Sequence, residues 1–312
     1  MSETTAATLS ALQSQLGRVI LGKPEAIEHV LVALVAGQHL LMEDVPGVGK
    51  TTLAKALARC FSGAFRRVQF TPDLLPSDIL GSSVYDPRDG GFTFKEGPVF
   101  ANVVLADEIN RASPRTQSAL LEAMSEGQVS SEGTTRALPT PFLVLATQNP
   151  VEFHGTYPLP EAQLDRFGLR IGLGYPSAEH EADVLFSQTE RHPLEGVTPV
   201  LAADDVLALQ AETRAVRVDR SLGRYVVALA EATRRHPSVG LGCSPRGSLM
   251  LFRAAQARAL LEGRDYAVPE DVAAQAVTVL AHRLGLETKA RYTGVSKEDV
   301  VREVLDGVPV PA

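Results

Sequence analysis

A stretch of small residues ends in a lysine and two threonines and leads into a predicted helix. It consists of Asp44, Val45, Pro46, Gly47, Val48, Gly49, Lys50, Thr51 and Thr52. Small residues let backbone N–H groups wrap a phosphate, and the helix N-terminus behind them favours its negative charge. Lys50 would neutralise the β- and γ-phosphate oxygens, and Thr51 would coordinate Mg²⁺. A surface turn that contains Gly-Lys-Thr by chance is the alternative, which the strand-loop-helix context disfavours.

Two adjacent acidic residues, Asp107 and Glu108, follow a short apolar run at residues 103–106. If this run is a strand of a parallel sheet, both carboxylates lie at the carboxyl edge, where ligands of such sheets bind. Asp107 would then hold Mg²⁺ through a water molecule, and Glu108 would deprotonate the water that attacks a γ-phosphate. An isolated Asp-Glu pair is more often a solvated turn, but its position downstream of Lys50 favours a function.

An alternating α/β core is needed to bring these groups to one edge. Short apolar runs bounded by turn residues predict five parallel strands, at residues 39–43, 67–70, 102–106, 142–147 and 169–173. Helical periodicity predicts helices among them at residues 24–36, 51–61 and 114–126. The third has Ser113 as its N-cap, Pro114 in its first turn and Gly127 after its end.

From residue 177 onward the apolar pattern changes to helical periodicity alone. It predicts helices at residues 178–191, 204–216, 222–236, 245–262, 269–284 and 297–305. We therefore expect two domains, an α/β nucleotide-binding core at residues 1–176 and an all-α domain at residues 177–312. The Thr- and Ala-rich first few residues are expected to be a frayed end.

Composition limits the classes of protein to which the chain can belong. With 312 residues, 45% hydrophobic and 21% charged, it is an ordinary globular chain rather than a disordered one. No apolar run approaches the ~18 residues that cross a bilayer, and the acidic start is unlike a secretory signal, so we expect a cytoplasmic protein without an integral membrane segment. A net charge of −7 opposes constitutive binding to nucleic acid. Cys60 and Cys243 lack metal-ligand spacing and are expected to be buried.

Five motifs in a fixed order resemble those of AAA+ ATPases and, more closely, of the MoxR family. They are Val45-Pro46-Gly47-Val48-Gly49-Lys50-Thr51, Asp107-Glu108-Ile109-Asn110-Arg111-Ala112, Ala146-Thr147-Gln148-Asn149-Pro150, Leu159-Pro160-Glu161-Ala162-Gln163-Leu164-Asp165-Arg166-Phe167 and Ser244-Pro245-Arg246. The resemblance extends over nearly the whole chain and implies a P-loop AAA+ core followed by a helical lid. Asp44 departs from the general loop pattern, in which glycine holds the first position.

By this resemblance, three further polar residues are expected to act on ATP. Asn149 would be sensor 1, which hydrogen-bonds the γ-phosphate or the attacking water, and its alternative is a structural turn. Arg166 would be the arginine finger supplied to the nucleotide of a neighbouring subunit, and its alternative is an ion pair with Asp165 or another surface salt bridge. Arg246 would be sensor 2, and its position suits that role, since a Ser-Pro start places it in the first turn of a helix, whose positive end favours phosphate. Its alternative is an exposed first-turn arginine.

Other residues have less specific roles in the resemblance. Val19, Ile20 and Gly22 would border the adenine ring, or else belong to the core and a turn. Arg111 would lie at a subunit face, with a solvated loop position as the alternative. His154 has no Cys or His partner at ligand spacing, so we expect no metal role for it.

Two segments are expected to form β-hairpins inserted into the core. Residues 82–85 would pair with 91–94, and residues 127–129 with 136–138. The resemblance implies a helix-2 insert and a pre-sensor-1 hairpin, which project toward a ring axis or a partner, and inert surface hairpins are the alternative. The first has Arg88 and Lys95 against Asp86, Asp89 and Glu96. This acidic balance does not fit a motor that tracks a phosphate backbone.

Together these inferences indicate an AAA+ ATPase that hydrolyses ATP to ADP and phosphate with Mg²⁺. The resemblance implies a homo-oligomeric ring, expected to be a hexamer, that remodels, matures or inserts a cofactor into a protein client with a partner carrying a von Willebrand factor A domain. Two alternatives remain, a nucleic-acid motor of the same hairpin-bearing branch and a nucleotide-dependent scaffold with little turnover. Acidity disfavours the motor, and the presence of Glu108, Asn149 and Arg166 disfavours the scaffold.

Overall fold

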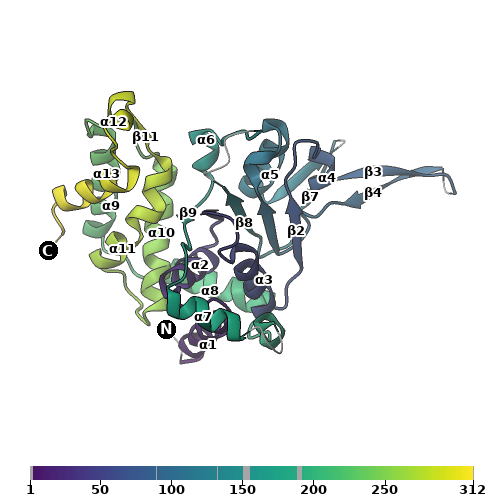
Figure 1. Ribbon diagram of the computed structural model, residues 1–312, viewed down its shortest axis with the longest axis horizontal. Coiled ribbons are helices and arrows are strands. Elements are labelled where there is room, and N and C mark those ends of the chain that lie inside the picture. Colours follow the sequence, from purple (N-terminus) through teal and green to yellow (C-terminus); the bar gives the residue numbers. More distant parts are fainter. Residues whose placement is uncertain (1–2, 89, 132, 150–154, 188–191, 312) are drawn as a thin grey trace.

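A five-stranded parallel sheet forms the centre of the N-terminal half (Figure 1). The computed structural model describes residues 3–88, 90–131, 133–149, 155–187 and 192–311. The strands are β1 (Leu40–Glu43), β2 (Phe65–Gln69), β5 (Val103–Asp107), β8 (Leu143–Gln148) and β9 (Leu169–Ile171). Their order in the sheet is β2-β5-β8-β1-β9, and all four neighbouring pairs are parallel. All five predicted strands are therefore confirmed, with ends shifted by at most two residues.

Helices cover both faces of this sheet. They are α1 (Glu3–Val19), α2 (Pro24–Ala36), α3 (Lys50–Cys60), α4 (Pro76–Leu80), α5 (Pro114–Glu126) and α6 (Glu161–Leu164), with a 3₁₀ turn at Ile109–Arg111. Strand β5 is buried along its whole length, and its side chains alternate between the two faces of the sheet. Val103 and Leu105 pack in the cluster that includes α1 to α3, whereas Val104 and Ala106 pack in the cluster that includes α5. Two-sided burial explains why this strand reads as a continuous apolar run.

The prediction of a frayed N-terminus is wrong, because α1 starts within the first few residues. Leu9, Leu12 and Leu16 recur at helical spacing and are at most 3% exposed, so they form an apolar stripe that packs into the core. The hydroxyl of Thr5 also donates to the carboxylate of Glu212, at 2.9 and 3.0 Å. These contacts with distant residues order a segment whose composition alone suggested fraying.

Both predicted β-hairpins are confirmed. In the first, β3 (Gly81–Asp86) pairs with β4 (Gly91–Glu96), and in the second, β6 (Gln128–Ser131) pairs with β7 (Thr134–Ala137). The β3–β4 hairpin projects far from the body of the protein (Figure 1). The rings of Tyr85 and Phe92 lie 5.4 Å apart on it and are largely exposed. Asp89, at its turn, lies outside the described residues.

The C-terminal half is helical, as expected. Its helices are α7 (Ala178–Ser187), α8 (Ala203–Ala215), α9 (Arg220–Arg235), α10 (Pro245–Leu261), α11 (Pro269–Leu280), α12 (Thr288–Tyr292) and α13 (Lys297–Gly307), with 3₁₀ turns at Pro193–Gly196 and Ala281–Arg283. A small antiparallel ladder of β10 (Val239–Leu241) and β11 (Gly285–Leu286) was not anticipated. Helices α9, α10, α11 and α13 form a bundle, whereas α7 and α8 lie beside α1 to α3 (Figure 1). Residues 188–191 of one predicted helix lie outside the described part of the chain.

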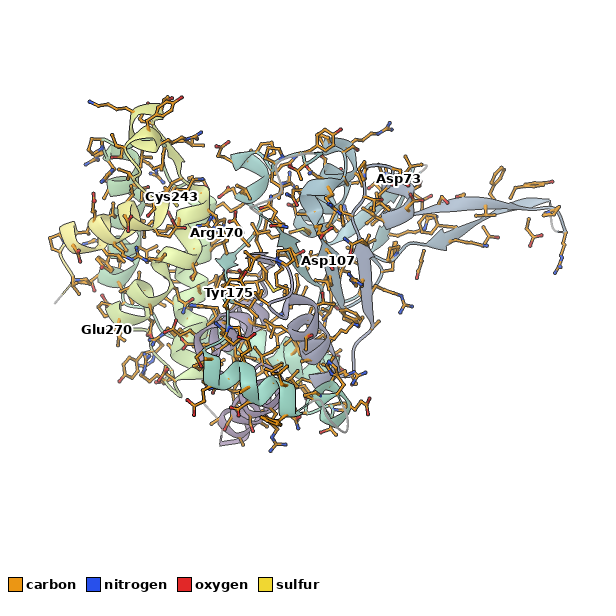
Figure 2. The ribbon with its side chains drawn as sticks, in the orientation of Figure 1. Asp73, Asp107, Arg170, Tyr175, Cys243 and Glu270 are labelled. Atoms are coloured by element: carbon orange, nitrogen blue, oxygen red, sulfur yellow. The ribbon has the colours of Figure 1, made fainter. Side chains whose placement is uncertain are left out.

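Burial of the two cysteines is also confirmed. Cys60 lies in α3, and Cys243 precedes α10 in the bundle (Figure 2). Burial raises the pKa of each thiol to about 11, so both are held as neutral thiols. Within the described ranges, no helix is both long and apolar enough to span a bilayer.

Candidate nucleotide site

A cavity of about 280 Å³ lies at the carboxyl edge of the sheet, where β1, β5 and β8 end. It is lined by Pro46, Gly47, Gly49, Lys50, Thr51, Thr52, Asp107, Glu108, Thr147, Gln148 and Asn149. The structure thus brings the predicted phosphate loop, the acidic pair and the sensor 1 candidate around one space. Of the predicted loop, Asp44, Val45 and Val48 are not part of this lining, and Val48 faces an adjoining cavity.

The loop has the backbone shape that its glycines allow. Gly47 and Gly49 have φ values of +85° and +98°, in the left-handed region that other residues rarely adopt. Lys50 begins α3, and its Nζ donates to the backbone carbonyls of Asp44 at 2.6 Å and Val45 at 3.2 Å. Burial lowers the pKa of the Lys50 ammonium, while nearby carboxylates oppose that shift. The ammonium therefore sits at the loop, where a phosphate can replace its carbonyl partners.

Asp107 ends β5 with its carboxylate held on both sides. Its Oδ1 accepts the hydroxyl of Thr147 at 2.6 Å, and its Oδ2 accepts Nη2 of Arg67 at 2.6 Å. The same hydroxyl oxygen of Thr147 accepts the backbone N–H of Glu108 at 2.8 Å. Thr147 is 1% exposed, so a buried hydroxyl fixes the carboxylate of one acidic residue and the backbone of the next.

Glu108 has a strained backbone and two side-chain partners. Its φ of +57° is the only left-handed value of a non-glycine residue within the described ranges. Such strain often accompanies functional positions, because the surrounding structure must offset its cost. The carboxylate accepts Nε2 of Gln69 at 2.7 Å and pairs with Nη1 of Arg111 at 3.1 Å. These two partners hold the carboxylate toward β2.

The oxygen atoms available here fit a magnesium ion. The hydroxyl of Thr51 and the carboxylate of Asp107 line the same cavity, and Mg²⁺ prefers such hard oxygen ligands. The described residues contain no group of three or more His, Cys, Asp or Glu side chains placed to hold a metal. One hydroxyl and one carboxylate suit an ion that keeps its waters and binds phosphate oxygens, which is the usual behaviour of Mg²⁺.

An adjoining cavity of about 200 Å³ has a lining in which apolar residues predominate over polar ones, and it shares loop residues with the first. Val19, Ile20 and Val48 contribute side chains from one side, and Val184 of α7 from another. Val19 and Ile20 are thus placed where a flat apolar ring could pack. Gly22 instead lies against the His180 ring, to which an added Cβ would approach within 2.4 Å. His154, for which no metal role was expected, lies outside the described residues.

Arg166 lies at the opposite, amino edge of the sheet. Its Nη1 donates to the carbonyl of Leu121 at 2.7 Å and to the hydroxyl of Ser125 at 2.6 Å, both in the C-terminal half of α5. The alternative ion pair with Asp165 is not formed, because Asp165 pairs with Arg283 at 3.0 Å. A four-residue strand such as β1 spans about 13 Å, so Arg166 is well separated from the phosphate loop of its own chain.

Arg246 lies near the same amino edge. Ser244 caps α10 by accepting the N–H of Gly247 at 3.1 Å, and its hydroxyl also donates to the Asp165 carboxylate at 2.9 Å. Arg246 is exposed in the first turn that follows. The helix position is confirmed, but the structure does not bring this helix end to the chain's own phosphate loop. The Ser-Pro-Arg motif predicted the helix cap correctly. The contact of Ser244 with Asp165 places this end of α10 at the amino edge of the sheet.

Three polar residues at the carboxyl edge were missed by sequence reasoning. Thr147 lies inside a recognised motif, and its position two residues before Asn149 in a strand was a usable signal. Arg67 and Gln69 lie on β2, which precedes β5 by a long connection. Only the sheet order, which places β2 beside β5, brings them to the acidic pair.

Two comparisons of sequence agree with this geometry. Residues 39–169 match the family described as ATPase family associated with various cellular activities (AAA), and residues 231–304 match the AAA lid domain. The chain is 52% identical to the Bacillus subtilis protein YeaC, over 95% of this chain and 92% of the relative. It is 43% identical to chaperone MoxR1 of Mycobacterium tuberculosis (97% and 82% covered) and 34% identical to protein MoxR of Methylorubrum extorquens (96% and 94% covered).

A solved structure is similar over nearly the full length. A crystal structure of a protein from Cytophaga hutchinsonii superposes with a TM-score of 0.91 at 38% sequence identity. The match covers 99% of this chain and 98% of the other. At this identity and coverage, the arrangement of sheet and helices is shared throughout the two chains.

Proposed function

The chain belongs to the MoxR family of AAA+ ATPases, and we propose that it binds ATP with Mg²⁺ and hydrolyses it to ADP and phosphate. The observation that carries this proposal is the cavity in which Lys50, Thr51, Asp107, Glu108 and Asn149 meet. A positive charge, hard oxygen ligands, a base and an amide donor are the groups that phosphoryl transfer to water requires.

Each residue has a distinct task in the proposed reaction. The loop N–H groups and Lys50 hold the β- and γ-phosphates, and Asn149 donates its amide to the γ-phosphate or to the attacking water. When bound, Mg²⁺ would neutralise phosphate charge, held by Thr51 and, through water, by Asp107. Glu108 takes one proton from the water while the water oxygen attacks the γ-phosphorus. The bond between the γ-phosphorus and the bridging oxygen of ADP breaks in the same reaction. For this step its carboxylate must turn from Gln69 and Arg111 toward the water.

We further propose that the active assembly is a homo-oligomeric ring, expected to be a hexamer, with ATP between subunits. Arg166 and Arg246 support this, because they lie at the amino edge while the phosphate loop lies at the carboxyl edge. In a head-to-tail ring, one edge of each subunit can meet the other edge of its neighbour. The arginine finger, and sensor 2 with it, would then act in trans. We divide the chain for this purpose into a core at residues 1–176 with two hairpin insertions and a lid at residues 177–312.

The client is proposed to be a protein, and the setting cytoplasmic. One relative is named a chaperone, which supports chaperone-like remodelling of a protein client. Maturation of the client or cofactor insertion into it, with a partner carrying a von Willebrand factor A domain, is what the family resemblance implies, and we propose it on that ground alone. The exposed Tyr85 and Phe92 on a projecting hairpin offer apolar contact area. The net charge of −7 speaks against the alternative of a nucleic-acid motor. A scaffold with little turnover is the other alternative.

Hydrolysis measured by phosphate release tests the proposal. We expect Glu108→Gln to retain ATP binding and lose turnover, because the amide cannot accept the proton. Glu270→Gln, an exposed residue in the first turn of α11, is the matched control and should behave as wild type. Wild-type binding without turnover would instead support the scaffold.

Oligonucleotides added across a salt series separate the two kinds of client. We expect no stimulation by DNA or RNA at physiological salt and stimulation by a protein partner. A several-fold increase with oligonucleotide that fades as salt rises would support the motor, since phosphate contacts are salt-dependent.

A further inference from the structure

Asp44, which stands where glycine opens the usual phosphate loop, accepts three backbone N–H groups. Its Oδ1 accepts Val45 N at 2.8 Å, and its Oδ2 accepts Leu173 N at 2.7 Å and Gly174 N at 2.5 Å. Leu173 and Gly174 belong to the segment that follows β9 and leads to α7. Hydrogen bonds to an ionised carboxylate are among the stronger ones in proteins, and glycine could make none of these. Because Asp44 replaces the usual glycine, its carboxylate links the phosphate loop to the segment that follows β9.

The connecting segment is fitted closely against the loop. A Cβ on Gly172 would lie 3.3 Å from the carbonyl oxygen of Glu43 and 3.6 Å from Oδ2 of Asp44. Gly174 has a φ of +63°, and Lys23 Nζ donates to the carbonyl of Tyr175 at 2.7 Å. The following residues, in particular Pro176 and those of α7, line the apolar cavity beside the loop. Asp44 thus sets how far the wall of that cavity lies from the phosphate loop.

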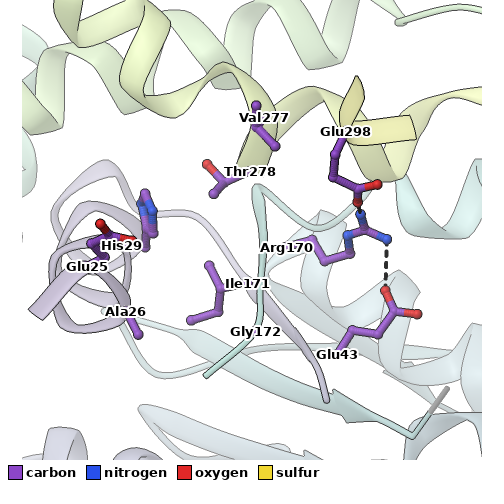
Figure 3. Close-up of a pocket in the computed structure, with 10 residues that line it drawn as sticks. All are labelled: Glu25, Ala26, His29, Glu43, Arg170, Ile171, Gly172, Val277, Thr278 and Glu298. Atoms are coloured by element: carbon purple, nitrogen blue, oxygen red, sulfur yellow. Dashed lines mark hydrogen bonds and ion pairs between the residues drawn. The ribbon is translucent and has the colours of Figure 1, made fainter. Parts of the chain in front are cut away.

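Glu43, the residue before Asp44, makes a second link that reaches the last helix. Its carboxylate accepts Nη1 of Arg170 at 2.8 Å, and the other terminal nitrogen of Arg170 pairs with Glu298 of α13. Figure 3 shows Arg170 between the two carboxylates, beside a cavity of about 440 Å³ between the core and the helical bundle. Figure 2 shows the same arginine where the core meets the bundle. Asp44 therefore connects the phosphate loop to the segment that leads into α7, and Glu43 connects it through Arg170 to α13.

Lys50 completes this connection at the loop. Its ammonium donates to the carbonyl of Asp44, the same residue whose carboxylate holds the connecting segment. An ammonium that turns to bind phosphate must loosen its bonds to these carbonyls, so phosphate binding acts directly on residue 44. We propose that Asp44 is a positioning residue that, together with the neighbouring Glu43 link, couples phosphate binding at Lys50 to the placement of α7 and of the helical bundle. This inference rests on the proposed ATPase function.

Asp44→Ala tests the coupling through two separate readouts. The first is steady-state ATP hydrolysis, in which we expect kcat to fall by about tenfold or more while KM changes less, because a charge-assisted contact is lost without removing the phosphate ligands. Asp44→Asn keeps one oxygen acceptor and should retain intermediate activity. Asp205→Ala is the matched control, since this carboxylate in the first turn of α8 also accepts a backbone N–H, that of Ala202 at 2.7 Å, and the substitution should leave turnover unchanged.

The second readout is the distance between spin labels at Lys55→Cys on α3 and Arg302→Cys on α13. Both positions are exposed, whereas Cys60 and Cys243 are buried and should remain unlabelled. With a non-hydrolysable ATP analogue we expect the distance distribution of the wild type to shift and that of Asp44→Ala to stay unchanged at saturation. A shift in Asp44→Ala equal to that of the wild type, or a wild type that binds without any shift, overturns the coupling. A wild type that binds no ATP analogue overturns the proposed function itself, and the inference with it.

Discussion

The two edges of the sheet differ in how their charged side chains are paired. At the carboxyl edge, Asp107 is largely buried and pairs with Arg67, whose side chain is 45% exposed, and the neighbouring groups face a cavity. At the amino edge, Asp165 pairs with Arg283, whose side chain is 1% exposed, and also accepts the hydroxyl of Ser244. The two pairs therefore differ in their arginines: that of the first is open to solvent, whereas that of the second lies in the interior, where core and lid meet.

This difference separates exchangeable contacts from structural ones. Exposed ion pairs contribute about 0–1 kcal/mol, so their partners can be replaced by a ligand at little cost. Breaking a buried pair costs about 3–5 kcal/mol, because one charge is left uncompensated. We infer that the carboxyl edge can exchange partners when a ligand binds, while the amino edge holds Arg166 through Leu121 and Ser125 and anchors the start of the helix that carries Arg246.

The largest expected effect is at the carboxyl edge. Lys50→Ala should abolish ATP binding, because it removes the charge that neutralises the phosphates. Equilibrium binding of a fluorescent ATP analogue measures this, and Lys55→Ala, on an exposed turn of the same helix, is the control. Near-normal binding by Lys50→Ala would show that the cavity is not the phosphate site.

Arg166→Ala should break the amino edge without affecting binding. Arginine fingers contribute roughly 10³ to 10⁵ in rate, so turnover should be nearly lost while nucleotide still binds. In the proposed ring, each active site combines the phosphate loop of one subunit with the arginine finger of its neighbour. Mixing Arg166→Ala with Lys50→Ala should therefore restore part of the activity, at junctions where an intact loop meets an intact finger. A mixture as inactive as either variant alone, with subunit exchange demonstrated, would contradict action in trans.

Arg283→Met tests the structural role of the amino edge. Burial lowers the pKa of Arg283 to about 10, although Asp165 opposes the shift, so the guanidinium stays charged at neutral pH. The substitution leaves the Asp165 carboxylate without its cation, and we expect a loss of about 3–5 kcal/mol in unfolding free energy by urea titration. Arg302→Ala, which breaks an exposed pair with Asp299, should cost less than about 1 kcal/mol. Equal losses would remove the distinction between the edges.

Acid should lower the stability of the fold at the amino edge, because His39 takes up a proton more readily in the unfolded chain than in the folded one, and this is the smallest of the expected effects. Its Nδ1 accepts the N–H of Val144 at 3.0 Å, so Nε2 carries the proton toward the carbonyl of Met124, and burial lowers its pKa to about 4. Between pH 6.5 and 5 the unfolded chain binds a proton that the folded chain does not, so stability falls as pH falls, by up to ~1.4 kcal/mol per pH unit. Unfolding titrations should show a slope smaller by about one proton in His39→Gln. An unchanged slope would contradict this assignment.

The sequence by itself determined the local chemistry of both edges. The apolar runs predicted where the strands end. The glycines before Lys50 predicted a phosphate loop, because such a loop needs a backbone shape that glycine adopts easily. The Ser113 cap of α5 was readable too, because capping depends on neighbours within a few residues. Lys50, Asp107 and Glu108 could likewise be named from their neighbours before their cavity was known, whereas Asn149 was named from the family resemblance.

Only the tertiary structure decided which of these groups meet. The sheet order brings Gln69 to Glu108. The contact of Ser244 with Asp165 places the start of α10, and with it Arg246, at the amino edge of the sheet, opposite the phosphate loop. Two of the three backbone partners of the Asp44 carboxylate lie 129 and 130 positions away in the chain, which no local pattern encodes. Strand order, helix docking and loop contacts depend on long-range packing, and such packing also orders α1 against its composition. The residues carry the chemistry, and the packing of distant segments assigns each to its edge.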